Sequence, residues 1–235
     1  MTSLPDIHLY TWLTCNGVKI SIALEELSLP YKVTEVDIGS GKQKEAWFTD
    51  INPNGRIPAI TDGNKRIFES GAILLYLADR YDSDNKFSYA HGTPEYYEQL
   101  SWIMFQMGGV GPMQGQANHF RLFASEYSQY SIDRYMEETK RLYGVLNRRL
   151  TQSAWLAGDK YTIADICNYG WVRYAPLALR LDLDEFPALK NWHDAIAERE
   201  AVRKGVNVPR ASSDQELMQR YRLLEQKTLA RKINK

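Results

Sequence analysis

The chain has little cysteine and no long apolar run. Only two of its 235 residues are cysteines, Cys15 and Cys167, which is too few for the disulfide framework of a small secreted protein. No stretch approaches the roughly 20 apolar residues of a membrane-spanning helix. The first six residues have neither the basic start nor the apolar core of a signal peptide. We therefore expect a cytoplasmic protein with reduced thiols and no membrane partner.

Excess charge and metal-ligand clusters are also lacking. The 29 basic and 29 acidic side chains cancel, which disfavours an electrostatic nucleic-acid binder. The segment Gly39-Ser40-Gly41-Lys42 lacks the further glycine and the Ser or Thr of a phosphate-binding loop. No two histidines have the i, i+4 spacing of helical metal ligands, so we expect no bound metal. The histidines are His8, His91, His119 and His193.

The first eighty residues alternate between strand and helix patterns, and the rest of the chain is helical. A polar stretch, 82–92, separates the two parts and is interpreted as an interdomain linker. The expected early elements are strands at 7–10, 31–37, 58–61 and 66–68 and helices at 17–27 and 70–81. The expected later helices are 95–107, 132–150, 163–179 and 186–199.

Two segments point to a small peptide ligand. In 52–60, a turn leads through Ile57-Pro58 into a strand, and a cis bond there would expose the backbone of Ile57 as an edge for a peptide. The alternative is an ordinary proline at a strand start. Glu69 and Ser70 begin a helix, where they either cap it or hold an amino-acid head group, with the carboxylate at Ser70 and the ammonium at Glu69.

A third segment, 10–19, leads from a strand end into a helix start that carries small polar residues, where a thiol becomes more acidic. With these three segments, residues 6–205 resemble a cytosolic glutathione transferase. The resemblance implies a thioredoxin-like N-terminal domain (5–84), an all-helical C-terminal domain (92–209) and a basic tail (210–235) that we expect to be helical. It also includes a capping box, Thr162 to Asp165, which we assign to folding.

Two motifs narrow the resemblance. Thr14-Cys15-Asn16-Gly17 resembles the T-P-N-G of nu-class bacterial enzymes and of their fungal relatives, which are similar to the yeast nitrogen-catabolite regulator. The segment 105–116, FQMGGVGPMQGQ, resembles a helix-breaking signature of that group. The long Asn-rich prion segment of the yeast regulator is absent from this sequence, so no prion function is implied.

The resemblance also implies site residues. It places Asn16 and Thr14 beside the sulfur of glutathione, where each can donate a hydrogen bond to a thiolate. It implies that five residues hold the tripeptide: Gln43, Arg56, Ile57, Glu69 and Ser70. Arg134 either reaches glutathione from the helical domain or pairs with Glu137 or Glu138 on its own helix.

Three further residues, 118–120, are candidates for the second-substrate pocket, although we expect His119 to be a core histidine. Cys15 replaces the proline that is usual in the family. A cysteine at a helix start can be a nucleophile, but Cys15 lies one residue past Thr14, the position of the nucleophile in other classes. We therefore expect it to be a bystander.

The predicted function is reduction of small disulfides by bound glutathione, with peroxides as a further substrate class. Glutathione is the co-substrate, glutathione disulfide is a further ligand, and the expected assembly is a homodimer. One alternative is an enzyme that conjugates glutathione to electrophiles, for which the support is the aromatic content of the second domain. The other is a regulatory binding protein without catalysis. The aromatic residues are Trp102, Phe105, Phe120, Phe123, Trp171 and Tyr174.

Overall fold

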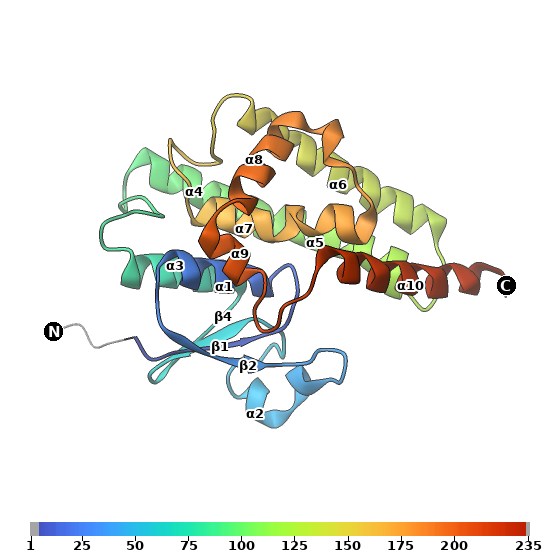
Figure 1. Cartoon of the computed structure of the whole chain (residues 1–235), viewed down its shortest axis with the longest axis horizontal. Helices are drawn as coiled ribbons and strands as arrows, with labels where there is room; N and C mark the ends of the chain where they lie inside the picture. The colour runs from blue at the N-terminus through green and yellow to red at the C-terminus, as the bar shows by residue number, and fades with distance from the viewer. Residues whose placement is uncertain (1–4, 234–235) are drawn as a thin grey trace.

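A four-stranded sheet forms the base of the molecule in the computed structural model, which describes residues 5–233 (Figure 1). The strand order is β2-β1-β3-β4, in which β1 is parallel to β2 and antiparallel to β3, and β3 is antiparallel to β4. This mixed sheet confirms the predicted thioredoxin-like N-terminal domain. The strands are β1 (Ile7–Thr11), β2 (Tyr31–Glu35), β3 (Ala59–Asp62) and β4 (Lys65–Phe68).

Helices cover both faces of this sheet (Figure 1). On one side lie α1 (Gly17–Glu26) and α3 (Ser70–Tyr81), whose apolar side chains join the main core. On the other side, α2 (Ala46–Thr49) follows the short turn η1 (Lys42–Lys44) and buries Phe48 beneath the sheet. The end of β1, the start of β3 and the end of β4 therefore lie side by side, next to the starts of α1 and α3, where the sequence predicted the ligand.

The second part of the chain is helical, as predicted, and it lies against α1 and α3 (Figure 1). Its capping box is confirmed: the Thr162 side chain accepts from the Ala164 amide, and Asp165 accepts from the Thr162 amide. The longer helices are α4 (Pro94–Phe105), α5 (Gly111–Asn118), α6 (Gln129–Leu150), α7 (Ile163–Val172), α8 (Pro187–Ala197) and α9 (Glu200–Gly205).

One apolar core runs through both parts. The close approach of helices from different parts depends on glycines. A Cβ at Gly170 of α7 would lie 2.6 Å from the Cys15 carbonyl oxygen, and a Cβ at Gly205 of α9 would lie 2.6 Å from the backbone of Ile22. These contacts seat α7 and α9 directly on α1. The helical part therefore fixes the position of the α1 N-terminus.

The expectation of a helix break in 105–116 is wrong. The chain stays helical from α4 through two wider π turns, η2 (Gln106–Val110) and η3 (His119–Phe123), with α5 between them. The glycines here serve packing, since Gly111 and Gly115 both lie against Trp171 of α7. Pro112 stands in the first turn of α5, directly after the π turn η2. A π turn rotates the following side chains, which often marks a functional site.

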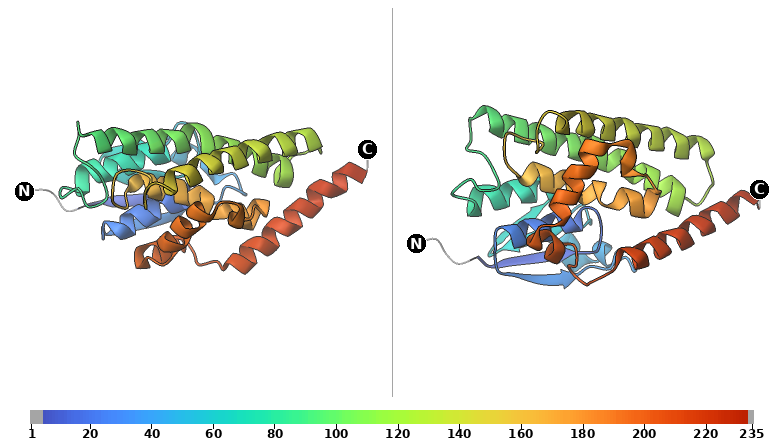
Figure 2. Two further views of the ribbon diagram at one scale, coloured as in Figure 1. Left: turned by 90° about the horizontal axis from the view of Figure 1, so that it is seen from above. Right: turned by 45° about the horizontal axis from the view of Figure 1, so that its top comes forward.

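The tail contains α10 (Asp214–Ile233), which begins near the sheet and runs to the far end of the molecule (Figure 2). It packs against η3 and η4 (Ala175–Leu179). Its Glu225 pairs with Arg121 and Arg180. Within residues 5–233, no helix combines the length and the apolar character needed to cross a membrane.

Candidate functional site

Two adjoining cavities lie at the N-terminal end of α1. One, of about 370 Å³, is lined by the sheet-containing part of the chain alone, and the other, of about 500 Å³, lies between that part and the helices η2 and α5. Asn16 and Arg56 line both cavities and so mark their junction. The first is lined by Thr14, Asn16, Ile38, Gln43, Lys44, Gly55, Arg56 and Ile57. The second includes Asn16, Arg56, Glu69, Gln106, Met107, Gly115, Gln116, His119 and Trp171.

Asn16 is held in one orientation by the helical domain. Its Oδ1 accepts a hydrogen bond of 2.8 Å from the indole Nε1 of Trp171. Because an indole N–H can only donate, the side-chain oxygen of Asn16 must face Trp171. The Nδ2 group, with two N–H donors, is then left for the cavities. Asn16 therefore presents a fixed donor at the point where the cavities join.

Thr14 supports the same helix start. Its Oγ1 accepts from the Gly17 amide at 3.0 Å, which satisfies one of the free amides of the first turn of α1. A hydroxyl that accepts in this way keeps its own proton for a second partner. Since Thr14 lines the first cavity, this proton can be donated to a ligand there.

Cys15 does not belong to the set of residues that line the cavities. It packs against the main core, close to α7, and it is only partly accessible. Burial raises the pKa of its thiol to about 12, although Lys19 partly opposes this effect. The thiol is therefore protonated at neutral pH. This is the opposite of the acidic thiol that a helix start favours, because burial has the largest effect on this thiol.

The loop residues predicted to hold a peptide line the first cavity. Ile57-Pro58 is a cis peptide bond, one of the two alternatives that the sequence left open. Gln43 donates to the Ile38 carbonyl at 3.3 Å, but its buried Oε1 has no partner in the described structure and is left for a ligand. Arg56 is exposed at the junction of the cavities, and its carbonyl is held by Asn52. The sequence analysis missed Lys44, which lies in the same wall.

Glu69 and Ser70 behave differently from one another. Glu69 lines the second cavity and has a φ of 67°, a conformation that costs a residue other than glycine roughly 1–3 kcal/mol. Its carboxylate accepts from Asn54 at 3.4 Å. Ser70 is 3% exposed, and its hydroxyl faces inward, accepting from Lys19 Nζ at 3.2 Å. Thus Ser70 does not line either cavity as a free hydroxyl.

The structure does not bring Arg134 to either cavity. Its guanidinium lies 3.8 Å from Glu138, four residues along α6, and the side chain is half exposed. This is the alternative pairing that the sequence left open.

His119 corrects an expectation. It is exposed and lines the second cavity, so it is not a core histidine. The π turn η3 starts at this residue and turns it away from the core. Phe120 instead stacks on Tyr135. Gln106 and Met107 also line the second cavity, but the sequence analysis named them only as part of the motif 105–116. They lie in the π turn η2, which the spacing of residues in the sequence does not reveal.

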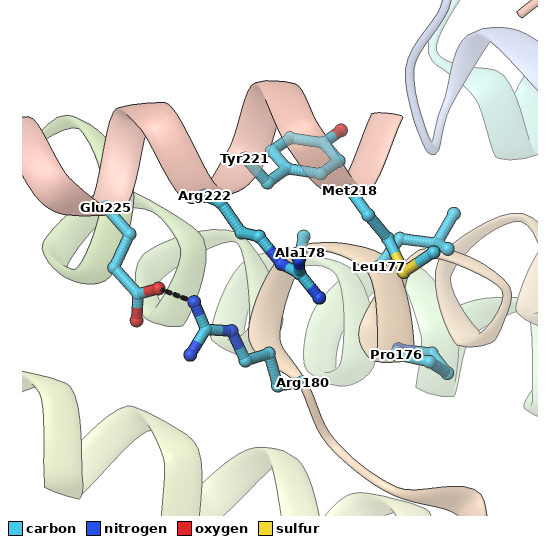
Figure 3. Close-up of a pocket in the computed structure, with 8 residues that line it drawn as sticks. All are labelled: Pro176, Leu177, Ala178, Arg180, Met218, Tyr221, Arg222 and Glu225. Atoms are coloured by element: carbon cyan, nitrogen blue, oxygen red, sulfur yellow. Dashed lines mark hydrogen bonds and ion pairs between the residues drawn. The ribbon is translucent and has the colours of Figure 1, made fainter. Parts of the chain in front are cut away.

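A third hollow, between η4 and α10, is much smaller (Figure 3). Its volume of about 30 Å³ suits one water molecule. Figure 3 shows the Arg180 side chain directed at Glu225 across this hollow. No group of three metal-ligating side chains occurs in the part of the chain that the structure describes. The two joined cavities are the candidate site because Thr14, Asn16, Gln43, Arg56, Ile57 and Glu69, which the sequence predicted, line them.

A thioredoxin-like sheet, a helical second domain and a cavity at their junction define the glutathione transferase class. The family of the glutathione S-transferase N-terminal domain matches residues 5–79, and that of the C-terminal domain matches residues 105–200. The chain belongs to the glutathione S-transferase family.

Three relatives refine this result. The disulfide-bond oxidoreductase YfcG of Escherichia coli is 46% identical over 203 residues, which are 83% of this chain and 92% of that protein. A glutathione transferase homologue from Lodderomyces elongisporus, solved with two glutathione molecules per subunit, is 45% identical with a TM-score of 0.84 and covers 88% of this chain and 100% of its own. The transferase URE2P8 of Phanerochaete chrysosporium, solved with oxidised glutathione, is 36% identical with a TM-score of 0.83. The match covers 94% of this chain and 100% of URE2P8. The predicted resemblance to the nu-class and yeast-regulator-like group is confirmed.

Proposed function

We propose that the protein is a glutathione-dependent thiol–disulfide oxidoreductase that reduces small disulfides. The observation that carries the proposal is the orientation of Asn16, whose amide donors face the junction of two cavities because Trp171 holds its oxygen. A donor at this point can stabilise the sulfur of one glutathione while a second sulfur approaches from the adjoining cavity. The relatives solved with two glutathione molecules or with oxidised glutathione support this use of the paired cavities.

The first cavity suits the tripeptide. The backbone of Ile57 and the unpartnered Oε1 of Gln43 can pair with its peptide groups, and Arg56 and Lys44 can pair with its glycine carboxylate. The γ-glutamyl head group is assigned to the N-terminus of α3. Its ammonium would pair with the Glu69 carboxylate, and its carboxylate would accept hydrogen bonds from the first backbone amides of the helix, beginning with that of Ser70.

The chemistry proceeds by thiolate exchange. Donors from Asn16 and Thr14 favour the ionised form of the bound thiol. This thiolate attacks one sulfur of the substrate disulfide, forms a mixed disulfide and releases the other sulfur as a thiolate. A second glutathione thiolate then attacks the glutathione sulfur of the mixed disulfide. The products are glutathione disulfide and two substrate thiols, and no protein cysteine is oxidised.

Conjugation to apolar electrophiles has less support. Of the six aromatic residues that favoured it in the sequence, only Trp171 lines the second cavity, and the charged or polar groups there include Glu69, Gln116 and His119. Such a wall favours a polar second substrate. A regulatory protein without catalysis would use the same fold, so only turnover separates it from an enzyme.

The test compares two reactions at saturating glutathione. The purified protein is assayed with 2-hydroxyethyl disulfide and with 1-chloro-2,4-dinitrobenzene, and binding of glutathione disulfide is measured by calorimetry. We expect binding of glutathione disulfide and a kcat/KM for the disulfide at least about 10-fold above that for the electrophile. Binding without turnover of either substrate would support the regulator, and faster conjugation would support the transferase.

We also propose a cytoplasmic homodimer. Reduced glutathione is abundant in the cytoplasm, and both cysteines are free thiols, as expected there. Three large apolar side chains of β4 and α4 are exposed and would be covered by a second copy of the chain. They are Phe68, Tyr97 and Met104.

A further inference from the structure

Lys19 is a buried lysine that the function described above does not use. It lies in the first turn of α1 and is 0% exposed. Its Nζ donates to the Ser70 hydroxyl at 3.2 Å, to the Gln106 side-chain oxygen and, at 3.8 Å, to the Met107 sulfur. It therefore joins α1 and α3 to η2 directly behind the cavities.

The charge of Lys19 has no direct counterion. Among the described residues it takes part in no ion pair, and its partners are a hydroxyl, an amide oxygen and a thioether. Gln106 also accepts from the Cys167 thiol at 3.0 Å. Burial lowers the pKa of Lys19, an effect that Cys167, Cys15 and Glu69 partly offset. A buried, unpaired ammonium is unfavourable by several kcal/mol unless an anion comes close.

The hydrogen bond from Lys19 to Ser70 determines where the hydroxyl hydrogen of Ser70 can point. Because the ammonium donates to Ser70 Oγ, the hydroxyl must donate its own hydrogen elsewhere. Its present acceptor is the Met107 sulfur at 3.6 Å, which is a weak acceptor. Met107 belongs to the wall of the second cavity. A carboxylate at the start of α3 would be a far stronger acceptor for the same hydrogen.

We propose that Lys19 is a positioning residue for the γ-glutamyl carboxylate of glutathione. It holds the oxygen of the Ser70 hydroxyl, so that the hydroxyl hydrogen points to Met107 in the wall of the second cavity and can turn to a carboxylate bound at the N-terminus of α3. The inference rests on the proposed function, because it takes glutathione as the ligand and the start of α3 as the place of its head group. It adds a residue that touches no ligand and acts through Ser70.

The test uses glutathione and an analogue, 4-aminobutanoyl-Cys-Gly, which lacks only the carboxylate in question. Calorimetry gives the Kd of both ligands for the parent protein, for Lys19→Met and for a control, Lys32→Met, whose side chain is exposed on β2 and pairs with Asp6. We expect Lys19→Met to weaken glutathione binding roughly 10-fold and to leave the Kd of the analogue unchanged. The control should bind both ligands as the parent does.

The outcomes separate the two proposals. A parent protein that binds no glutathione contradicts the proposed function itself. A parent that binds glutathione and the analogue equally, or a Lys19→Met variant that loses both ligands to the same extent, overturns the role of Lys19 alone. If Lys19→Met does not fold, Lys19→Gln replaces it, since it keeps a polar side chain at this position and removes the long ammonium arm that reaches Ser70. Selective loss of glutathione binding then supports the proposal, and equal loss of both ligands overturns it.

Discussion

Asn16 and Trp171 lie 155 positions apart in the chain, and their hydrogen bond is the contact that defines the site. The resemblance to the glutathione transferase family pointed to Asn16, which stands at a helix start. The sequence could not point to Trp171, because that contact depends on the packing of α7 against α1. The same limit applies to Ser70, whose position was predicted but whose hydroxyl faces Lys19. Local spacing thus finds residues on one element but not the direction in which tertiary contacts hold them.

The raised pKa of Cys15 gives a prediction at this scale. With a pKa of about 12 in the folded protein, the thiol stays protonated through pH 9, whereas in the unfolded chain it ionises at its ordinary value. Iodoacetamide should therefore label Cys15 at pH 8 at least about 100-fold more slowly in the native protein than in denaturant. Peptide mass spectrometry gives both rates. Fast labelling of the native protein near pH 7 would show an acidic thiol instead.

At the scale of elements, the order of strands and helices followed from the sequence, but the packing between them did not. Alternating and helical periodicities are local and could be read from single segments. The π turns η2 and η3 could not be read in this way, because glycine and proline suggested a break. The tertiary contacts of Gly111 and Gly115 with Trp171 keep this stretch helical.

A pair of glycine variants tests this packing. A Cβ at Gly170 would lie 2.6 Å from the Cys15 carbonyl oxygen and 2.8 Å from Lys19, so Gly170→Ala should lower the free energy of unfolding by roughly 1–3 kcal/mol. Gly144 in α6 is the matched control, because a Cβ there meets nothing within 4 Å. Gly144→Ala should raise the free energy by about 0.5–1 kcal/mol. Urea unfolding measures both variants, and equal effects would contradict the α1–α7 contact.

At the scale of the whole molecule, the two parts of the chain share one core and one site. The α1 helix packs on both α7 and α9, and the second cavity has walls from both parts. The division into two parts could be predicted from the sequence, because strand and helix patterns alternate up to residue 81 and only helical patterns follow the polar stretch 82–92. The joined cavities were not, since they depend on how helices from one part are placed on the other. The resemblance to a family supplied the residues that this placement brings together.

The exposed apolar side chains of β4 and α4 predict that two copies of the chain form a homodimer. Light scattering after size exclusion should give about twice the 27.1 kDa chain mass at micromolar concentration. Replacing both Tyr97 and Met104, which are 58% and 53% exposed, by glutamate should shift the protein to the monomer. A parent protein that is already monomeric would contradict the proposal.

The most direct test of the account is a comparison of Asn16→Ala, Trp171→Phe and Cys15→Ser in the reduction of 2-hydroxyethyl disulfide by glutathione. Loss of the donor to the thiolate should lower kcat/KM roughly 10- to 100-fold for Asn16→Ala, because a hydrogen bond to a charged group is worth about 1.5–3 kcal/mol. Trp171→Phe removes the indole N–H that orients Asn16 and should cause a smaller loss. Cys15→Ser should keep at least about half of the activity, because glutathione supplies the attacking sulfur. An inactive Cys15→Ser enzyme, together with a glutathione adduct on Cys15 of the parent protein, would contradict the account.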